Sequence, residues 1–100
     1  MEENAMIMIA GHLKVPAAQR SAFVNAHADL VDRARAYSGC LDLSISEDPF
    51  DPSRVNLMEL WESETVLQEW RKVANPPKMD VQIEDGNVQK HHISRSGPPF

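Results

Sequence analysis

Residues 55–64 read VNLMELWESE, and within this stretch the pattern of a strand becomes that of a helix. Up to Trp61 the side chains largely alternate between apolar and polar, which is typical of a β-strand with two different faces. Ser63 can then act as an N-cap, and Glu64 suits the first turn of a helix. The stretch therefore predicts a strand over 55–61 that leads directly into a helix.

A strand and a long helix are predicted at the start of the chain. Residues 6–15, MIMIAGHLKV, are rich in Ile, Met and Leu and end at Pro16, which has no N–H to donate to a sheet. From 17 to 37 the apolar positions recur every three or four residues, which indicates one amphipathic helix of five turns or more. Gly39 is expected to end it.

Between the long helix and residue 55 the sequence predicts a strand and a loop. Apolar and polar residues alternate over 41–46, which indicates a half-buried strand. Residues 47–53, EDPFDPS, contain two Asp-Pro steps and predict a loop.

The helix that starts after Ser63 continues with apolar residues at helical spacing and is expected to end at Asn75-Pro76-Pro77. We expect a short helical turn within 79–85 and a last strand over 87–94. The order of elements is then β-α-β-β-α-β, which is the ferredoxin-like α+β arrangement: an antiparallel sheet with both helices on one face.

The other face of such a sheet has no helix to cover it. In the first strand both alternating sets are apolar, with Ile7 and Ile9 on one face and Met6 and Met8 on the other. A large apolar sheet surface is unfavourable in water. We therefore expect a homodimer whose two sheets pack face to face.

Composition limits the classes of function. One hundred residues indicate a single domain over 1–100, with a core over about 6–94 and loose tails at 1–5 and 96–100. The net charge of −5, with the basic residues scattered, argues against nucleic-acid binding. No apolar run approaches the roughly 20 residues of a membrane-spanning helix, so we expect no membrane partner and a cytoplasmic location.

The single cysteine, Cys40, excludes an internal disulfide, and nothing basic adjoins it in sequence. We interpret it as a small buried hydrophobic residue rather than a nucleophile. No pair of histidines at helical spacing and no carboxylate cluster indicates a metal site.

Several segments together resemble the antibiotic biosynthesis monooxygenase (ABM) domain family, which belongs to the dimeric α+β barrel superfamily. The resemblance extends over about residues 6–94. The segments that carry it are AGHLKV at 10–15 followed by Pro16, GCLDLSIS at 39–46, DPSRVN at 51–56 and above all ELWESE at 59–64.

The resemblance implies a homodimer that forms a barrel, with a separate pocket between sheet and helices in each subunit. Several relatives oxidise phenolic polycyclic substrates to quinones with molecular oxygen and without metal or flavin; others degrade haem or act on quinols. Many relatives carry a histidine nine residues after the motif tryptophan. Here that position is Trp70, so the resemblance does not extend to haem ligation by this residue, and no cofactor is expected.

In the relatives the tryptophan that corresponds to Trp61 faces the helices. Val55, Leu57 and Glu59 then face them too, and Asn56, Met58 and Leu60 face the barrel, because side chains alternate along a strand. A carboxylate in an apolar pocket is a candidate for the base that takes a proton from a phenol, unless Glu59 pairs with a basic group such as Arg54. Trp61 is either a pocket wall for an aromatic ligand or a plain core residue.

His12 and His27 complete the candidate catalytic residues with Glu59 and Trp61, because a histidine side chain can act as an acid or a base in catalysis. His12 is expected on the barrel side of the first strand and His27 at the sheet-facing boundary of the long helix. His91 and His92 are expected on opposite faces of the last strand, one solvated and one in a core position. The candidate substrate-binding residues are Ile9, Phe23, Leu57, Trp61 and Trp70.

Three hypotheses follow. The first is a cofactor-independent monooxygenase-like enzyme that oxidises a small phenol or quinol with molecular oxygen. The second is a non-catalytic dimeric protein that binds small aromatic or lipid-like molecules. The third is a space between sheet and helices that serves only packing. Oxygen uptake with anthrones and hydroquinones separates the first hypothesis from the other two.

Overall fold

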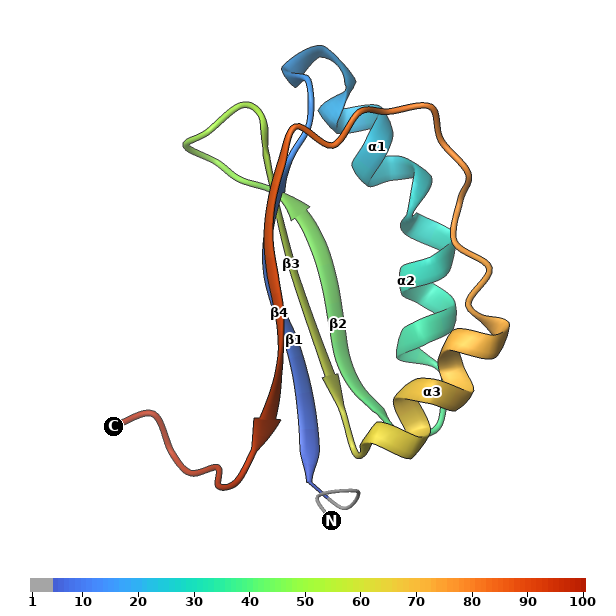
Figure 1. Cartoon of the computed structure of the whole chain (residues 1–100), viewed down its shortest axis with the longest axis vertical. Helices are drawn as coiled ribbons and strands as arrows, with labels where there is room; N and C mark the ends of the chain where they lie inside the picture. Colours follow the sequence, from blue (N-terminus) through green and yellow to red (C-terminus); the bar gives the residue numbers. More distant parts are fainter. Residues whose placement is uncertain (1–4) are drawn as a thin grey trace.

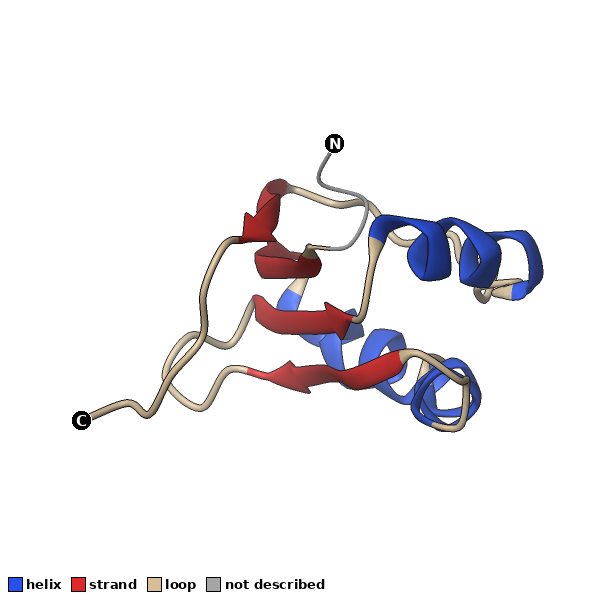
Figure 2. Ribbon diagram, turned by 90° about the horizontal axis from the view of Figure 1, so that it is seen from below, coloured by secondary structure: helices blue, strands red, loops and turns tan. Residues whose placement is uncertain are grey.

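The computed structural model describes residues 5–100 as one four-stranded sheet with helices on one face (Figures 1 and 2). The sheet is antiparallel, with the strand order β2-β3-β1-β4. The elements are β1 (Met6–Lys14), the 3-10 helix η1 (Ala17–Gln19), α1 (Arg20–Ala26), α2 (Ala28–Arg35), β2 (Cys40–Glu47), β3 (Arg54–Trp61), α3 (Glu64–Val73) and β4 (Asp85–Ile93). The predicted ferredoxin-like α+β fold is confirmed.

Residues 1–4, which belong to the tail expected over 1–5, lie outside the described residues. Residues 96–100 are exposed and form neither helix nor strand. The tail extends beyond β4 on the side away from the helices (Figure 1).

The predicted long helix is interrupted at His27, where α1 ends and α2 begins. The Nδ1 atom of His27 donates to the carbonyl of Phe23 at 2.8 Å. That carbonyl is the one the backbone N–H of His27 would use in a regular α-helix, and the N–H bonds Val24 instead, at 3.0 Å. A side chain that competes for a helical carbonyl therefore breaks a helix that periodicity alone predicts as continuous.

The turn after α2 depends on Gly39. This glycine has φ +98°, a conformation that other residues rarely adopt. It lies in the turn before β2, whereas α2 already ends at Arg35, before the predicted residue 37. A Cβ at Gly39 would also lie 2.5 Å from Cγ1 of Val66 in α3. Gly39 therefore allows α3 to pack closely against the turn at the end of the sheet where Trp61 lies.

The register of the strands defines two faces. Trp61 pairs with Ile7, Glu59 with Ile9 and Leu57 with Gly11 across β3 and β1. We call the face that these residues share the helix-side face, because Trp61 packs there against α3. The opposite face, here the open face, carries Met6, Met8, Ala10, His12, Asn56, Met58 and Leu60. The orientation predicted for strand 55–61 is confirmed.

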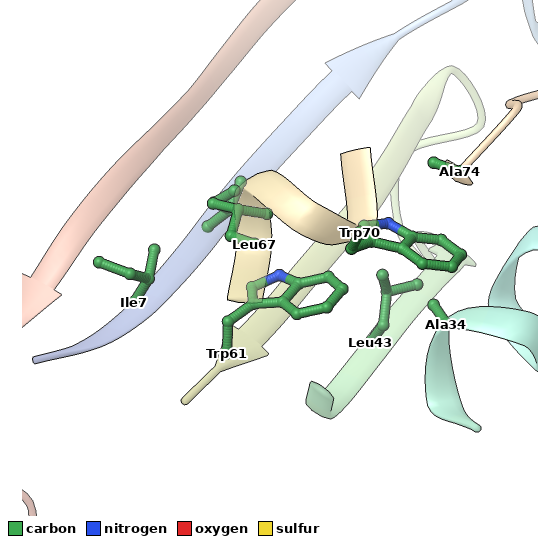
Figure 3. Packing of buried hydrophobic residues seen from close by; sticks show 8 residues of the cluster. Ile7, Ala34, Leu43, Trp61, Leu67, Trp70 and Ala74 are labelled. Atoms are coloured by element: carbon green, nitrogen blue, oxygen red, sulfur yellow. The ribbon is translucent and has the colours of Figure 1, made fainter. Parts of the chain in front are cut away.

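Two hydrophobic clusters fill the space between the helix-side face and the helices. The larger one contains Ile7, Ile9, Ala34, Leu43, Trp61, Leu67, Trp70 and Ala74 (Figure 3). The smaller one, at the other end of the sheet, contains Val15, Phe23 and Val55. The helices are thus fixed to the sheet at both of its ends.

The helical turn expected within 79–85 is wrong. Residues 74–84 form no helix or strand, and the segment passes along the helices to the start of β4 (Figure 1). The strand begins with Asp85 beside Lys14, at the far end of β1 from Ile7. Ten extended residues span roughly 33 Å, whereas ten helical residues span about 15 Å. Only an extended segment covers most of the length of the sheet.

Candidate active site

Two side chains on the helix-side face of β3 are joined directly. The indole N–H of Trp61 donates to Oε1 of Glu59 at 3.0 Å. The two residues are two positions apart in one strand, so the alternation of the strand brings them to the same face. Trp61 is fully buried, and this bond satisfies its only polar group.

Trp61 belongs to a group of three aromatic rings. Its ring lies 6.0 Å from that of Trp70, at an interplanar angle of 30°. Tyr37 contacts the other indole edge-on, with ring centroids 5.3 Å apart. Trp70 is 5% exposed, and Leu67 and Leu43 lie beside the two indoles (Figure 3). The structure thus places both candidate tryptophans in the core.

Glu59 has a free oxygen. Within residues 5–100 no basic side chain forms an ion pair with it, and no second donor bonds its carboxylate. No buried polar side-chain atom in this part of the chain lacks a partner, so Oε2 of the half-buried Glu59 is open to solvent. Arg54, considered as a partner from sequence, lies on the open face and bonds Asn56 at 2.6 Å. Glu59 is therefore a carboxylate with one oriented and one available oxygen.

Cys40 lies on β2 opposite Trp61. Its partial burial, and next the negative charge of Glu59, raise the pKa of its thiol. A thiol with a raised pKa remains protonated at neutral pH and is a poor nucleophile. A thiol of this kind fits a packing residue better than a nucleophile, but Cys40 is half-buried and not buried as predicted.

The helix-side face is covered at its two ends and partly open between them. Leu57 and Glu59 of β3 and Ile45 of β2 are only half-buried, whereas Trp61 and Val55 at the ends of β3 are fully buried. Ile45 packs against both hydrophobic clusters. We call Ile45, Leu57 and Glu59 the central surface. It is the part of this face where a ligand can reach the free oxygen of Glu59.

The other candidate binding residues border the central surface. Ile9 pairs with Glu59 and is 7% exposed, and Phe23 of α1 is 9% exposed. Leu57 lies opposite Gly11, which has φ +152°. A Cβ on this glycine would lie 1.9 Å from the carbonyl oxygen of Asn87. The absence of a side chain at Gly11 lets the backbone of β4 approach β1 closely.

The candidate histidines are separated. His12 lies on the open face, as predicted, and thus on the other side of the sheet from Glu59. His27 lies where α1 meets α2, and its ring is 4.8 Å from that of Phe23. His27 donates through Nδ1 to a backbone carbonyl, so its neutral ring presents Nε2 as an acceptor. The structure joins Glu59 with Trp61 and His27 with Phe23.

Sequence analysis missed a charged group at the rim of this face. Lys90 of β4 pairs with Ile9 in the sheet and forms an ion pair of 2.9 Å with Glu64 of α3. His92, on the same face, lies 3.7 Å from the same carboxylate, whereas His91 is on the open face. Both histidines are exposed, so the expected core position is wrong. The register of β4 would have revealed the group, but no local pattern sets that register.

Residues 5–100 contain neither a metal-binding cluster nor a membrane-spanning helix. No group of three or more His, Cys, Asp or Glu side chains in that part of the chain is arranged to hold a metal ion. No described helix is both long enough and apolar enough to cross a membrane.

Comparison with protein families gives one match. The family model described as antibiotic biosynthesis monooxygenase (ABM) matches residues 6–75, which include β1, β2, β3 and α3. No curated protein matches the chain.

Solved structures share the fold. A Caulobacter crescentus protein, described as a "putative antibiotic biosynthesis monooxygenase", superimposes with a TM-score of 0.69 and 20% identity over 93% of each chain. A Pseudomonas aeruginosa protein superimposes with a TM-score of 0.70 and 13% identity, over 91% of this chain and 96% of its own. The heme-degrader MhuD of Mycobacterium tuberculosis, solved with two hemes in its active site, has a TM-score of 0.63 and 13% identity over 93% of this chain and 99% of its own. At these identities the likeness concerns the fold alone.

Proposed function

Because the chain belongs to the antibiotic biosynthesis monooxygenase family, we propose that it is an oxidoreductase that oxidises a small phenolic or quinol substrate with molecular oxygen. The observation that carries the proposal is Glu59. This carboxylate has one oxygen oriented by Trp61 and the other open to solvent at the central surface. A general base needs such a free, oriented acceptor within reach of the substrate.

In the proposed reaction Glu59 takes the proton of a substrate hydroxyl. The resulting phenolate is rich in electrons and transfers them to oxygen without a metal or flavin. With a hydroquinone the products are the quinone and H₂O₂, so two electrons and two protons pass to O₂. With an anthrone one oxygen atom replaces the two hydrogens of the reacting CH₂ group as a carbonyl, and the other leaves as water. The protein contributes orientation, exclusion of water and the base.

The substrate in this proposal lies on the central surface. Leu57 and Ile45 offer an apolar floor beside Glu59, and Ile9 and Phe23 border it. Trp61 and Trp70 stack on each other in the core beneath this floor, and the indole N–H of Trp61 orients Glu59. A flat aromatic ligand with one hydroxyl matches a surface that offers apolar contact and a single hydrogen-bond acceptor.

Haem is not proposed as the ligand. Trp70 is buried against Trp61 and Tyr37, and an indole nitrogen has no lone pair to offer iron. Nδ1 of His27 is already engaged with the carbonyl of Phe23 at 2.8 Å. The residues at the central surface therefore suit an organic phenol better than a metal centre.

We also propose that the active form is a homodimer joined through the open faces. Met6, Met8 and Ala10 of β1 and Met58 and Leu60 of β3 form an apolar band there, and each is only partly buried in the protomer. Polar residues such as His12, Asn56, Ser44 and Gln89 surround the band. An apolar centre with a polar rim is typical of protein interfaces.

The test is oxygen uptake by metal-free protein with a panel of anthrones and hydroquinones, each compared with the same mixture without protein. We expect at least one member to consume oxygen faster with the protein than without it. If no member does so while naphthol-like ligands raise the melting temperature, the protein is a binding module instead. That alternative is favoured by the core positions of Trp61 and Trp70, which leave Glu59 as the only polar group on the central surface.

A further inference from the structure

The loop between β2 and β3 presents an aromatic side chain to solvent. Phe50 lies within the segment EDPFDPS, and 93% of its surface is exposed. The loop leaves the sheet on the side away from the helices in both views (Figures 1 and 2). The loop that contains Phe50 therefore lies on the same side of the molecule as the open face.

The backbone around Phe50 is held by a carboxylate. Oδ2 of Asp48 accepts from the backbone N–H of Phe50 at 3.0 Å and from that of Asp51 at 2.8 Å. Oδ1 of Asp48 accepts from Asn56 at 2.9 Å. These bonds, the one from Asn56 first, lower the pKa of Asp48, so the carboxylate is ionised at neutral pH. The loop thus has one defined conformation near its exposed ring.

An arginine fixes the same loop to the rest of the fold. Nη1 of Arg20, at the start of α1, donates to the carbonyls of Asp48, Asp51 and Arg54 at 2.9, 2.6 and 3.1 Å. Its Nη2 pairs with Glu47 at 3.0 Å, and the side chain is only 14% exposed. The loop backbone is thus held at both sides, and the Phe50 ring remains exposed instead of packing on its own protomer.

The loop offers an apolar contact rather than charge. Each of its carboxylates already has a basic partner within the protomer: Arg20 for Glu47, Arg54 for Asp48 and Lys14 for Asp51. An ionic partner therefore gains little from this loop. An aromatic ring matches an apolar surface, and the apolar band of the open face lies on the same side of the molecule. A second copy of the chain presents the same band.

We propose that Phe50 is an anchor of the homodimer, packing on the second protomer when the two open faces meet. The inference rests on the dimer put forward under the proposed function and adds a contact outside the sheets. The loop backbone is already held before association, so less entropy is lost when the loop binds. Aromatic residues are among those that dominate binding. In a dimer with two-fold symmetry this contact occurs twice.

The experiment measures the dimer dissociation constant of fluorescently labelled protein by sedimentation velocity over a dilution series into the nanomolar range. For Phe50→Ala we expect the constant to rise at least about tenfold. Phe50→Leu, which keeps apolar bulk, should recover part of the loss. Val73→Ala is the matched control, because Val73 is 56% exposed on α3, on the helix side, and should leave the constant unchanged.

The outcomes separate the two proposals. If the wild-type protein is a dimer and Phe50→Ala dimerises as tightly as Val73→Ala, the proposed role of Phe50 is wrong, whereas the proposed homodimer is supported. If the wild-type protein is a monomer throughout the series, both fail. Far-ultraviolet circular dichroism of the variants checks their fold, which we expect unchanged because Phe50 makes no core contact in the protomer.

Discussion

The indole N–H of Trp61 lies 3.0 Å from Oε1 of Glu59 and donates a hydrogen bond to it. A fully buried residue thereby orients a half-buried carboxylate that reaches solvent with its other oxygen. Through this bond the packing of the core controls the position of the proposed base. In the proposed reaction the role of Trp61 is thus to position Glu59.

Substitution can separate this positioning role from packing. We expect Trp61→Phe and Trp70→Phe each to lower the free energy of unfolding by about 1 to 3 kcal/mol, because both remove buried volume. Only Trp61→Phe removes the donor to Glu59, so only this variant should lower kcat with KM little changed. Urea unfolding and oxygen uptake measure the two effects. Equal losses of kcat in the two variants would exclude the hydrogen bond as the cause.

Gly11 is expected to tolerate no side chain. A Cβ there would lie 1.9 Å from the carbonyl oxygen of Asn87, and the backbone has φ +152°. We predict that Gly11→Ala lowers the free energy of unfolding by about 2 kcal/mol or more, measured by urea unfolding. Gly97→Ala is the control, since a Cβ at Gly97 meets no atom within 4 Å. Comparable stability of both variants would contradict the close approach of β4 to β1.

Asp51 should make the protein sensitive to acid. Bonds from the backbone and side chain of Ser53 and from Lys14 lower the pKa of Asp51 from 3.8 to about 2. Between pH 3.8 and about 2 the unfolded chain binds more protons than the folded protein. The contribution of Asp51 to the free energy of unfolding is therefore complete above about pH 4 and is lost as the pH falls towards 2. We predict that wild type melts at a higher temperature than Asp51→Asn at pH 6 and that the difference disappears near pH 2. A difference independent of pH would contradict this origin.

The open face provides a test of the dimer itself. Met58→Asp places a charge in the centre of the apolar band, and a buried unpaired charge costs about 3 to 5 kcal/mol. We expect this variant to sediment as a folded monomer at micromolar concentration, where wild type is a dimer. Val73→Asp on the exposed side of α3 should remain dimeric. A Met58→Asp variant that dimerises like wild type would show that the interface lies elsewhere.

Much of the fold follows from local patterns in the sequence. Alternation set the faces of β3, Pro16 ended β1 as expected, and Ser63 accepts the capping hydrogen bond from Val66 at 3.2 Å. The two errors, at His27 and over 79–85, have different origins. At His27 a side chain bonds the carbonyl that the helix needs, and over 79–85 the distance to β4 dictates an extended chain. Neither is visible in periodicity.

The candidate site was predictable only in part. The spacing of Glu59 and Trp61 within one strand placed them on one face, and their hydrogen bond agrees with that placement. That both tryptophans are buried, and that Lys90 reaches Glu64, depends on how α3 and β4 pack on the sheet. These contacts join residues far apart in sequence, and no local pattern fixes them.

The most direct measurement of the central claim is oxygen consumption by metal-free wild type and Glu59→Gln, side by side, with the most reactive member of the panel. Glutamine keeps the size of the side chain and an oxygen that accepts from Trp61, but it cannot take the substrate proton. We predict a turnover rate at least about 100-fold lower, with an unchanged melting temperature. Equal rates for the two proteins would show that Glu59 is not the base.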